Sequence, residues 1–375
     1  MTASSNLYAA TLTIDTDAVA ANYRLLQSKM KPGAVCGAAV KADGYGLGAG
    51  PVVEALWREG CRDFFVAHPH EGLIVRDELP DAKVYVLNGP LPDAIDAYLQ
   101  ARLIPVLNSL GDIELWRNAA KAKGRPLEAN VHIDTGMCRL GLDLTETKKL
   151  LADVDTLLDG IDVDMVMSHL ASADVIDSDH TPRQLEMFKT ATAYLPAKRL
   201  SLANSSGIFW GADYHFDVAR PGVALYGGNP TPHTDNPLQN PVTLTARILQ
   251  IRDVAPPETV GYGATHPVSA PARIATVPIG YADGFHREGS GKGMAHIGGH
   301  PAPIAGRVSM DLITLDVTGI PENIAHAGAE AEFMGAHRRP DDLARDWQTI
   351  PYEVLTGLGR RYRRRYVSSA QGGAV

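Results

Sequence analysis

Apolar and polar positions follow two alternating patterns along the first part of the chain, from about residue 14 to residue 230. Short runs rich in β-branched and aromatic residues are typical of buried strands, and the longer segments between them repeat apolar residues with helical period. The predicted strands are 34–40, 63–67, 84–87, 103–106, 128–133, 165–168, 200–203 and 217–219. The predicted helices include 18–30, 51–58, 93–100, 112–123, 145–154 and 183–192. Eight strand–helix units predict a (β/α)8 barrel of the TIM type, with a doubly wound parallel sheet as the alternative.

The pattern changes after a segment rich in Gly, Pro, Asn and Thr, residues 227–240, which is typical of a linker. Short β-rich runs separated by Gly and Pro then predict a mainly antiparallel β domain, with strands within 244–252, 272–278, 302–308 and 311–317. Residues 8–14 alternate as a strand, and we expect them to pair with this second domain. The predicted domains are therefore a barrel over 14–230 and a β domain over 231–375 that includes the N-terminal strand within 1–13.

Composition agrees with a folded protein of about two domains. The chain has 375 residues, of which 45% are hydrophobic and 21% charged. Its formal net charge of −8 argues against nucleic acid or an anionic membrane surface as the main partner. A small-molecule substrate fits this balance better.

The cysteines and the N-terminal segment predict a cytoplasmic, non-membrane protein. Cys36, Cys61 and Cys138 are an odd number at wide spacing, which suggests neither a disulfide framework nor a metal site. The N-terminal segment lacks the basic and apolar regions of a signal peptide, and no 18 uninterrupted apolar residues occur. The pairs His68/His70 and His296/His300 have no third ligand at a recognised spacing, so we expect no metal.

A lysine follows the first predicted barrel strand directly and opens a glycine-rich loop, Lys41–Gly48. Catalytic groups of such barrels lie at the carboxyl ends of the strands. Burial there lowers the pKa of a lysine, which frees the amine for Schiff-base chemistry with a carbonyl cofactor. Taken alone, the same pattern also fits a lysine that forms a salt bridge at the barrel rim.

Lys41–Gly48 resembles the KANAYGHG-type cofactor segment of alanine racemases, and further blocks agree with that family in order along the chain. These blocks are 134–141, 168–171, 204–205, 220–227, 261–263, 280–284, 306–311 and 351–353. The resemblance covers nearly the whole chain. It implies a fold-type III racemase that depends on pyridoxal 5'-phosphate and interconverts L-alanine and D-alanine, supplying D-alanine for peptidoglycan.

The resemblance also implies how the cofactor is held. Lys41 would carry it covalently, His169 would pack beside the pyridine ring, and Arg220 would face the ring nitrogen. A guanidinium cannot give up its proton, so Arg220 would leave this nitrogen unprotonated and weaken the ring as an electron sink, which favours racemisation over transamination. The residues that resemble the family's phosphate contacts are Tyr45, Asn204, Ser205, Gly222, Val223 and Tyr352.

Racemisation needs one base on each face of the substrate carbon. By resemblance, Lys41 is one base and Tyr262, contributed by the partner subunit, is the other. Met310 and Asp311 would also come from the partner, which implies a homodimer with shared sites. Arg139 resembles the arginine that contacts the phenolic oxygen of the cofactor, and Tyr281 resembles a residue at the substrate entrance.

Five positions depart from the pattern of the family, among them Asp43 in place of an asparagine and Ser309 in place of a cysteine. Position 132 is a histidine where many relatives carry a lysine that can be carbamylated, so either His132 itself or a bound anion must orient Arg139. Ser201 replaces a histidine that bridges toward the arginine at the ring nitrogen. Leu47 replaces a frequent histidine. None of these changes removes a reacting group.

Three other functions remain open at this point. A racemase of broader specificity, acting on serine, lysine or arginine, would share every catalytic residue. A non-catalytic pyridoxal-phosphate carrier would lack both a β domain and a second base. A decarboxylase of the same fold group would need a cysteine or an acidic acid–base residue in the second domain, where the segment 306–311 offers Ser309.

Overall fold

The computed structural model describes residues 7–369 in two compact units, and the six residues at each end lie outside this part. The first six residues of the expected N-terminal strand segment and the last six of the expected β domain therefore lie outside the described residues. One unit consists of Ala20–Leu225 and Asn229–Leu238. The other contains Val19 and the described residues before it, Tyr226–Gly228, and the described residues from Gln239 onward.

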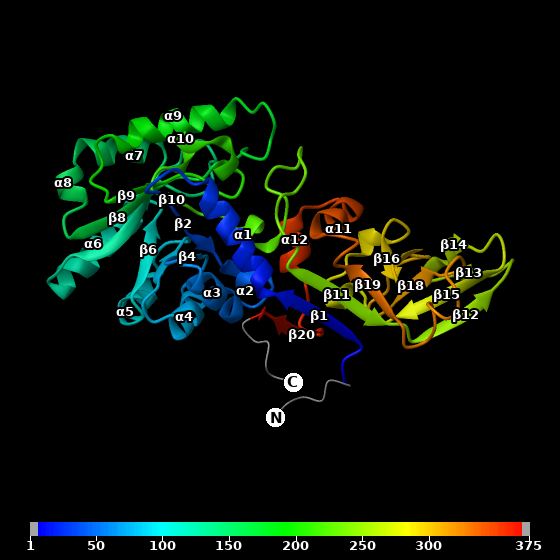
Figure 1. Cartoon of the computed structure of the whole chain (residues 1–375). Coiled ribbons are helices and arrows are strands. Elements are labelled where there is room, and N and C mark those ends of the chain that lie inside the picture. The colour runs from blue at the N-terminus through cyan, green and yellow to red at the C-terminus, as the bar shows by residue number, and fades with distance from the viewer. Residues whose placement is uncertain (1–6, 370–375) are drawn as a thin grey trace. The chain divides into compact units, whose positions relative to one another are not determined.

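The larger unit is the predicted parallel barrel (Figure 1). Seven parallel strands pair in chain order: β3 (Ala38–Ala39), β4 (Asp63–Val66), β5 (Lys83–Val86), β6 (Leu103–Leu107), β7 (Leu127–His132), β8 (Ile161–Met167) and β9 (Arg199–Ser201). An eighth, β10 (Val218–Ala219), pairs in parallel with β2 (Val35–Cys36). On its other side Arg220 donates its backbone N–H to Ala203 O at 2.8 Å, beyond the end of β9. Strands therefore follow one another around the whole barrel, and the (β/α)8 prediction is confirmed.

The first barrel strand is not continuous, in contrast to the prediction for 34–40. It breaks at Gly37 into β2, which pairs with β10, and β3, which pairs with β4. A Cβ on Gly37 would lie 2.8 Å from the Phe65 ring and 3.0 Å from Asp63 O. A glycine is needed because the backbone of the neighbouring strand approaches so closely.

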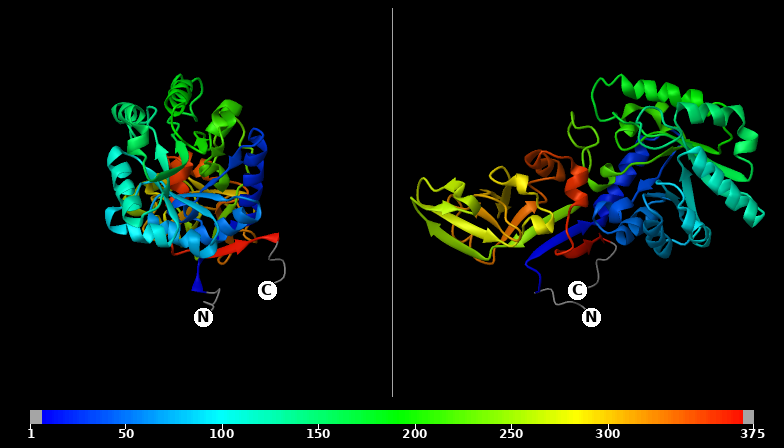
Figure 2. Two further views of the ribbon diagram at one scale, coloured as in Figure 1. Left: turned by 90° about the vertical axis from the view of Figure 1, so that its left-hand side faces the viewer. Right: turned by 180° about the vertical axis from the view of Figure 1, so that it is seen from behind.

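Helices surround the strands of the barrel, as the left view of Figure 2 shows. They are α1 (Thr16–Lys29), α3 (Ala49–Arg58), α4 (Pro69–Glu78), α5 (Ile95–Gln100), α6 (Leu110–Lys123), α7 (Leu144–Ala152), α8 (Val154–Leu157), α9 (His180–Thr192) and α10 (Ala212–His215). All six predicted helices overlap helices of the structure. We did not predict α4, because a glycine and exposed apolar residues blur its helical period.

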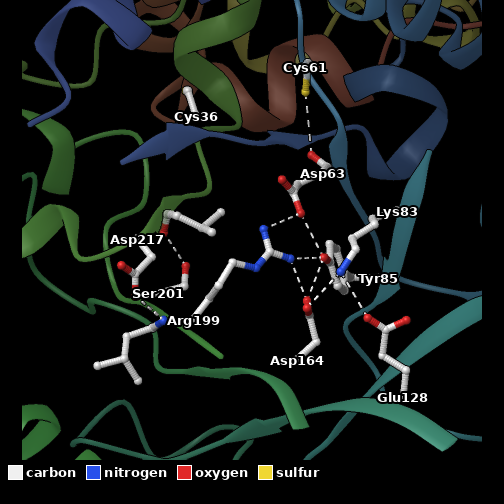
Figure 3. Close-up of polar contacts among 12 residues, drawn as sticks. Cys36, Cys61, Asp63, Lys83, Tyr85, Glu128, Asp164, Arg199, Ser201 and Asp217 are labelled. Carbon is white, nitrogen blue, oxygen red and sulfur yellow. Dashed lines mark hydrogen bonds and ion pairs between the residues drawn. The ribbon is translucent and has the colours of Figure 1, made fainter. Parts of the chain in front are cut away.

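A network of ionised side chains fills the barrel where its strands begin (Figure 3). Arg199 lies between two carboxylates, 2.9 Å from Asp63 Oδ1 and 2.5 Å from Asp164 Oδ2. The Tyr85 hydroxyl lies 2.8 Å and 2.9 Å from the same two groups. Lys83 Nζ donates to Asp164 at 2.8 Å. Each buried charge thus has a partner of opposite sign, as burial requires.

The second unit is mainly antiparallel. Its larger sheet has the strand order β17 (His300–Pro303), β16 (Met294–Ile297), β19 (Glu330–Met334), β11 (Val242–Arg247), β1 (Ala10–Asp15) and β20 (Arg363–Val367). A second sheet contains β12 (Gln250–Val254), β15 (Ala272–Val277) and β18 (Ile313–Asp316), and β13 (Thr259–Val260) pairs with β14 (His266–Pro267). β1 lies between β11, to which it is antiparallel, and β20, to which it is parallel. Among residues 7–369, no helix has the length and apolar character that a membrane crossing needs.

Two predictions for this unit were wrong in detail. The run 244–252 is two strands in different sheets, because Ile248 pairs with Ala329 whereas Leu249 pairs with Thr276. Helices α11 (Pro340–Trp347) and α12 (Pro351–Thr356) were not predicted, since the predicted elements of this unit end at residue 317.

Candidate active site

Lys41 lies two positions beyond the last residue of β3, at the carboxyl end of the barrel strands, and opens an unusual turn, labelled α2 (Lys41–Tyr45). Ala42, Asp43, Gly44 and Tyr45 have positive φ angles of 53°, 56°, 61° and 54°. This left-handed conformation costs a residue with a side chain roughly 1–2 kcal/mol. The turn is held by hydrogen bonds, among them Ala49 N to Asp43 Oδ1 at 2.9 Å. The bend carries the chain from the strand into α3.

The surroundings of Lys41 favour its unprotonated amine. Burial lowers the pKa of Lys41, the positive charge of Arg139 lowers it further, and the carboxylate of Glu71 acts in the opposite direction. At neutral pH a lowered pKa increases the fraction of the amine that is unprotonated and can act as a nucleophile or accept a proton.

Arg220 lies just after β10 and is 5% exposed. Its Nη2 donates to Ser168 O at 2.5 Å and lies 3.5 Å from His169 Nδ1, and its Nη1 donates to Ser201 Oγ. Burial lowers the pKa of Arg220 to about 9, which still leaves a cation at neutral pH. Ser201, which stands where many relatives have a histidine, thus accepts a hydrogen bond from the guanidinium of Arg220. Its hydroxyl in turn donates to Val218 O at 2.5 Å.

Two histidines beside these cations are neutral. Burial and the charges of Arg220 and Arg139 lower the pKa of His169 well below its usual value. Burial and the charge of Arg220 lower that of His132 to about 4. His132 Nδ1 lies 2.8 Å from Asn108 Oδ1, and the Asn108 amide group donates to Leu87 O and Val106 O. These two donations fix Oδ1 as the acceptor, so Nδ1 of His132 carries the proton.

The loops after β9 and β10 form a cradle suited to a phosphate. Ser205 Oγ accepts the N–H groups of Gly222 and Ala224 at 2.9 and 3.3 Å, which leaves its own hydrogen available for a further acceptor. A Cβ on Gly222 would lie 2.0 Å from Tyr45 Oη, so only glycine fits there. The carboxamide oxygen of Asn204 accepts Gly207 N at 2.9 Å.

Arg139 belongs to a loop organised by one carboxylate. Asp134 Oδ1 accepts the backbone N–H groups of Gly136 and Met137, both at 2.9 Å, and also that of Cys138. Arg139 follows, exposed, and its charge acts on Lys41, His132 and His169.

The remaining predicted residues belong to the second unit. Tyr262 is 71% exposed, Met310 53% and Tyr281 44%, which is high for large apolar groups. Tyr281 N donates to Ser309 O at 3.0 Å, and Gly263 approaches the Arg307 guanidinium. The segment 306–311 therefore lies against both tyrosine loops. Asp311 forms an ion pair with Arg361 at 2.7 Å, and Tyr352 is 39% exposed at the start of α12.

The structure thus brings together Lys41, Tyr45, Arg139, His169, Asn204, Ser205, Arg220, Gly222 and Val223 in the barrel unit. It groups Tyr262, Tyr281, Met310 and Asp311 in the other. The barrel residues fit pyridoxal phosphate. The amine of Lys41 can bond its aldehyde, a buried guanidinium can face its ring, and the hydroxyl of Ser205 can donate to its phosphate.

The sequence reasoning missed two residues beside these groups, Glu71 and Asn108. Glu71 was not predicted as a site residue, because the preceding His68-Pro-His70 was interpreted only as a possible metal-ligand pattern. Its signal was a proline two residues before a glutamate, which is typical of the first turn of a helix. Asn108, by contrast, had no pattern around it that pointed to the site.

A (β/α)8 barrel with a lysine and a buried arginine at the carboxyl ends of its strands, followed by a β domain, defines a class: the barrel-type pyridoxal-phosphate enzymes. Comparison with known families identifies the family within this class. Residues 14–230 match the family model "Alanine racemase, N-terminal domain", and residues 241–366 match "Alanine racemase, C-terminal domain". The chain belongs to the alanine racemase family, whose members are pyridoxal-phosphate-dependent isomerases.

Individual relatives are similar over nearly their full length. Alanine racemase of Rhodospirillum rubrum is 49% identical over 97% of both chains, and that of Brucella canis is 46% identical over 96% of this chain and 94% of its own. The crystal structure of alanine racemase from Bartonella henselae, with covalently bound pyridoxal phosphate, has a TM-score of 0.92 at 39% identity, covering 96% of this chain and 99% of that one. The biosynthetic enzyme of Pseudomonas aeruginosa gives 0.89 at 34%, covering 96% and 100%.

Proposed function

We propose that this chain interconverts L-alanine and D-alanine with pyridoxal phosphate attached to Lys41. The observation that carries the proposal is the Lys41 amine itself. It lies at the end of a barrel strand with a lowered pKa, in a chain that matches both domains of the family. The barrel, residues 14–230, holds the cofactor in this proposal, and residues 231–375 with the N-terminal strand complete the site of the partner.

When bound, pyridoxal phosphate supplies an electron-accepting ring that makes the α-hydrogen of the attached amino acid acidic. Arg220 limits this effect. Its guanidinium is fixed by Ser201 and Ser168 and remains a donor, so it leaves a facing ring nitrogen without a proton. With a weaker electron-accepting ring, the α-carbon is expected to regain a proton quickly, which suits racemisation better than transamination.

His169, held neutral by burial, adds no positive charge beside the ring. The residues proposed to hold the phosphate of the cofactor are Ser205, Asn204, Gly222, Val223, Tyr45 and Tyr352. Arg139 is proposed to bind the phenolic oxygen, and the neutral His132 is proposed to orient Arg139 by offering its guanidinium the acceptor nitrogen Nε2. The cradle around Gly222 and Ser205 supports this placement.

The α-carbon needs a base on each face. We assign one face to Lys41 and the other to Tyr262 of a partner subunit, with Met310, Asp311 and Tyr281 beside it. The 71% exposure of Tyr262 supports this assignment, since a tyrosine of that exposure in one chain is free to enter a site on another. The active form is thus proposed to be a homodimer with shared sites.

We further propose that the protein works in the cytoplasm and supplies D-alanine for peptidoglycan. Its three cysteines support this location, because all are unpaired and Cys138 is exposed, as in a reducing compartment.

Chiral analysis of the products formed by the purified protein tests the activity. Incubation of L-alanine with protein and pyridoxal phosphate should produce D-alanine until both enantiomers are equal. Serine, lysine and arginine should turn over at least roughly tenfold more slowly, measured as kcat/KM. A protein that racemises one of these faster than alanine contradicts the assigned substrate, and one that racemises none contradicts the function.

A further inference from the structure

The turn after Lys41 needs more support than its own backbone provides. Three of its four left-handed residues, Ala42, Asp43 and Tyr45, carry a side chain. At roughly 1–2 kcal/mol each, the conformation costs several kcal/mol. The turn's own hydrogen bonds, such as Gly46 N to Ala42 O at 2.7 Å, tie it internally but do not anchor it to the barrel.

One side chain from another element supplies such an anchor. Glu71, in the first turn of α4, accepts the N–H of Ala42 on Oε1 at 2.7 Å. Its Oε2 accepts the N–H groups of Ala67 and His68 at 2.7 and 3.0 Å, just beyond the end of β4. One half-buried carboxylate thus joins the residue after Lys41 to the end of the next barrel strand.

These bonds are of the strong kind. A carboxylate that accepts backbone N–H groups forms charge-assisted hydrogen bonds, roughly twice as strong as neutral ones. The position at the start of α4 also favours a negative charge through the helix dipole.

We propose that Glu71 is a positioning residue for Lys41: its carboxylate clamps the left-handed turn onto β4 and so fixes where the lysine amine lies at the barrel mouth. The catalytic consequence rests on the proposed function of Lys41, but the clamp itself does not. Glu71 also opposes the charge of Arg139 at the lysine, so the same group influences both the position and the proton affinity of the amine.

Glu71→Gln gives an asymmetric test. A glutamine has one oxygen, and it satisfies more partners by turning this oxygen toward the two N–H groups of Ala67 and His68. Its NH2 group then faces Ala42 N–H, two donors meet, and only the bond to the lysine turn is lost. Residue-resolved amide hydrogen exchange on the cofactor-free protein should therefore show about tenfold faster exchange at Ala42, with Ala67 and His68 nearly unchanged.

A second readout concerns the lysine itself. Without the carboxylate charge, the pKa of Lys41 should fall below that of the parent protein, measured by NMR of the 13C-methylated amine. In the loaded enzyme kcat should fall roughly ten- to a hundredfold, with KM changed less than about threefold. Glu71→Asp keeps the negative charge but has a shorter side chain. The pKa of Lys41 should therefore stay near that of the parent protein, whereas kcat should still fall.

Glu146→Gln is the matched control. Glu146 also lies in the first turn of a barrel helix and accepts one backbone N–H of the neighbouring helix α6, Leu110 N at 3.2 Å, which a glutamine oxygen can still accept. This variant should leave Ala42 exchange, the pKa of Lys41 and kcat unchanged.

An unchanged exchange rate at Ala42 in Glu71→Gln overturns the clamp. An equal increase of the exchange rates at Ala42, Ala67 and His68 overturns it as well. Faster exchange at Ala42 with an unchanged pKa and kcat overturns the positioning role. A failure of the alanine assay in the parent protein would instead reject the proposed function, and leaves the exchange result to be judged by itself.

Discussion

At the scale of single residues, the environment of Lys41 combines positive charges with neutral histidines. His132 contributes to this because its Nδ1 proton is bound to Asn108 and burial opposes a second proton. A group that must stay neutral when folded has a measurable effect on stability, since the unfolded chain accepts the proton that the folded protein refuses.

The pH dependence of stability follows with a definite sign. The pKa of His132 is about 4 in the folded protein and 6.5 is its ordinary value. As pH falls from 6.5 to 4, the unfolded chain gains a proton and the folded protein does not. The free energy of unfolding should therefore fall by up to about 1.4 kcal/mol per pH unit from this residue.

Urea denaturation of the cofactor-free protein between pH 4 and pH 7 measures this slope. His132→Asn should flatten it by nearly that amount, whereas His169 leaves a similar slope in both proteins. Parallel profiles for parent and variant would show that His132 is protonated in the folded state.

Gly222→Ala tests the cradle. The added methyl group would meet Tyr45 Oη at 2.0 Å, so the tyrosine ring must move away from the proposed phosphate position. Affinity for pyridoxal phosphate should fall at least roughly tenfold in a fluorescence titration of the cofactor-free protein. Gly111→Ala is the control, because a Cβ there meets only Ser109 Oγ at an ordinary 3.5 Å. Equal affinity in both variants would remove Tyr45 and Gly222 from the proposed phosphate site.

Sequence reasoning reached Lys41 because its signal is local: an apolar run ends and a glycine-rich loop begins. It could not connect Glu71 and Asn108 with the site, because the residues that join them to it are distant in sequence. Glu71 bonds a residue 29 positions away, and Asn108 bonds one 24 positions away. Such pairs are created by the closure of the barrel, which no local pattern contains.

At the scale of elements, the central feature is the charged network where the barrel strands begin. Strands β4, β8 and β9 each contribute one side chain to it, Asp63, Asp164 and Arg199, and β5 contributes two, Lys83 and Tyr85. Its position at the end opposite the proposed cofactor makes it a structural group.

Arg199→Met should therefore destabilise the protein without altering the site. The change leaves Asp63 and Asp164, 8% and 3% exposed, without their shared cation, which costs about 3–5 kcal/mol of unfolding free energy. Arg24→Met breaks the exposed pair with Glu59 and should cost less than about 1 kcal/mol.

Chemical denaturation measures both variants, and kcat of the folded Arg199→Met protein should stay within about threefold of the parent. Equal, small losses of stability would contradict the structural role of the network. A large loss of kcat at full stability would place Arg199 in the catalytic machinery instead.

The barrel strands were predictable to within a few residues because each is a short apolar run between turn residues. The breaks were not. Residues 34–40 and 244–252 both read as single strands, yet Gly37 and the step from Ile248 to Leu249 divide them. In each case the chain changes the strand with which it pairs. The local alternation of apolar and polar residues does not indicate which strand that is.

At the scale of the whole molecule, the number of strand–helix units determined the barrel prediction, and the change of pattern after residue 227 indicated a second domain. The pattern could not indicate that Tyr262 acts with Lys41, since the two lie in different units. That pairing came only from the family resemblance, and it requires a direct test.

Subunit mixing tests the shared site. Lys41→Ala and Tyr262→Phe should each be inactive as homodimers. A mixed dimer has one site with both bases intact and one with neither, so mixing should restore up to about half the activity per mixed dimer. Subunit exchange is verified by native mass spectrometry. Proven exchange without recovery would mean that both bases belong to one chain.

The central claim is that two bases, one on each face, exchange the α-proton. It is tested most directly by solvent deuterium exchange with the Tyr262→Phe enzyme. This variant keeps Lys41, which we assign to the α-proton of D-alanine, and loses the base for L-alanine. Mass spectrometry should show deuterium at the α-carbon of D-alanine, labelling of L-alanine slower by about a hundredfold or more, and almost no racemisation. Labelling of L-alanine with D-alanine spared would reverse the two roles, and undiminished racemisation would contradict the account.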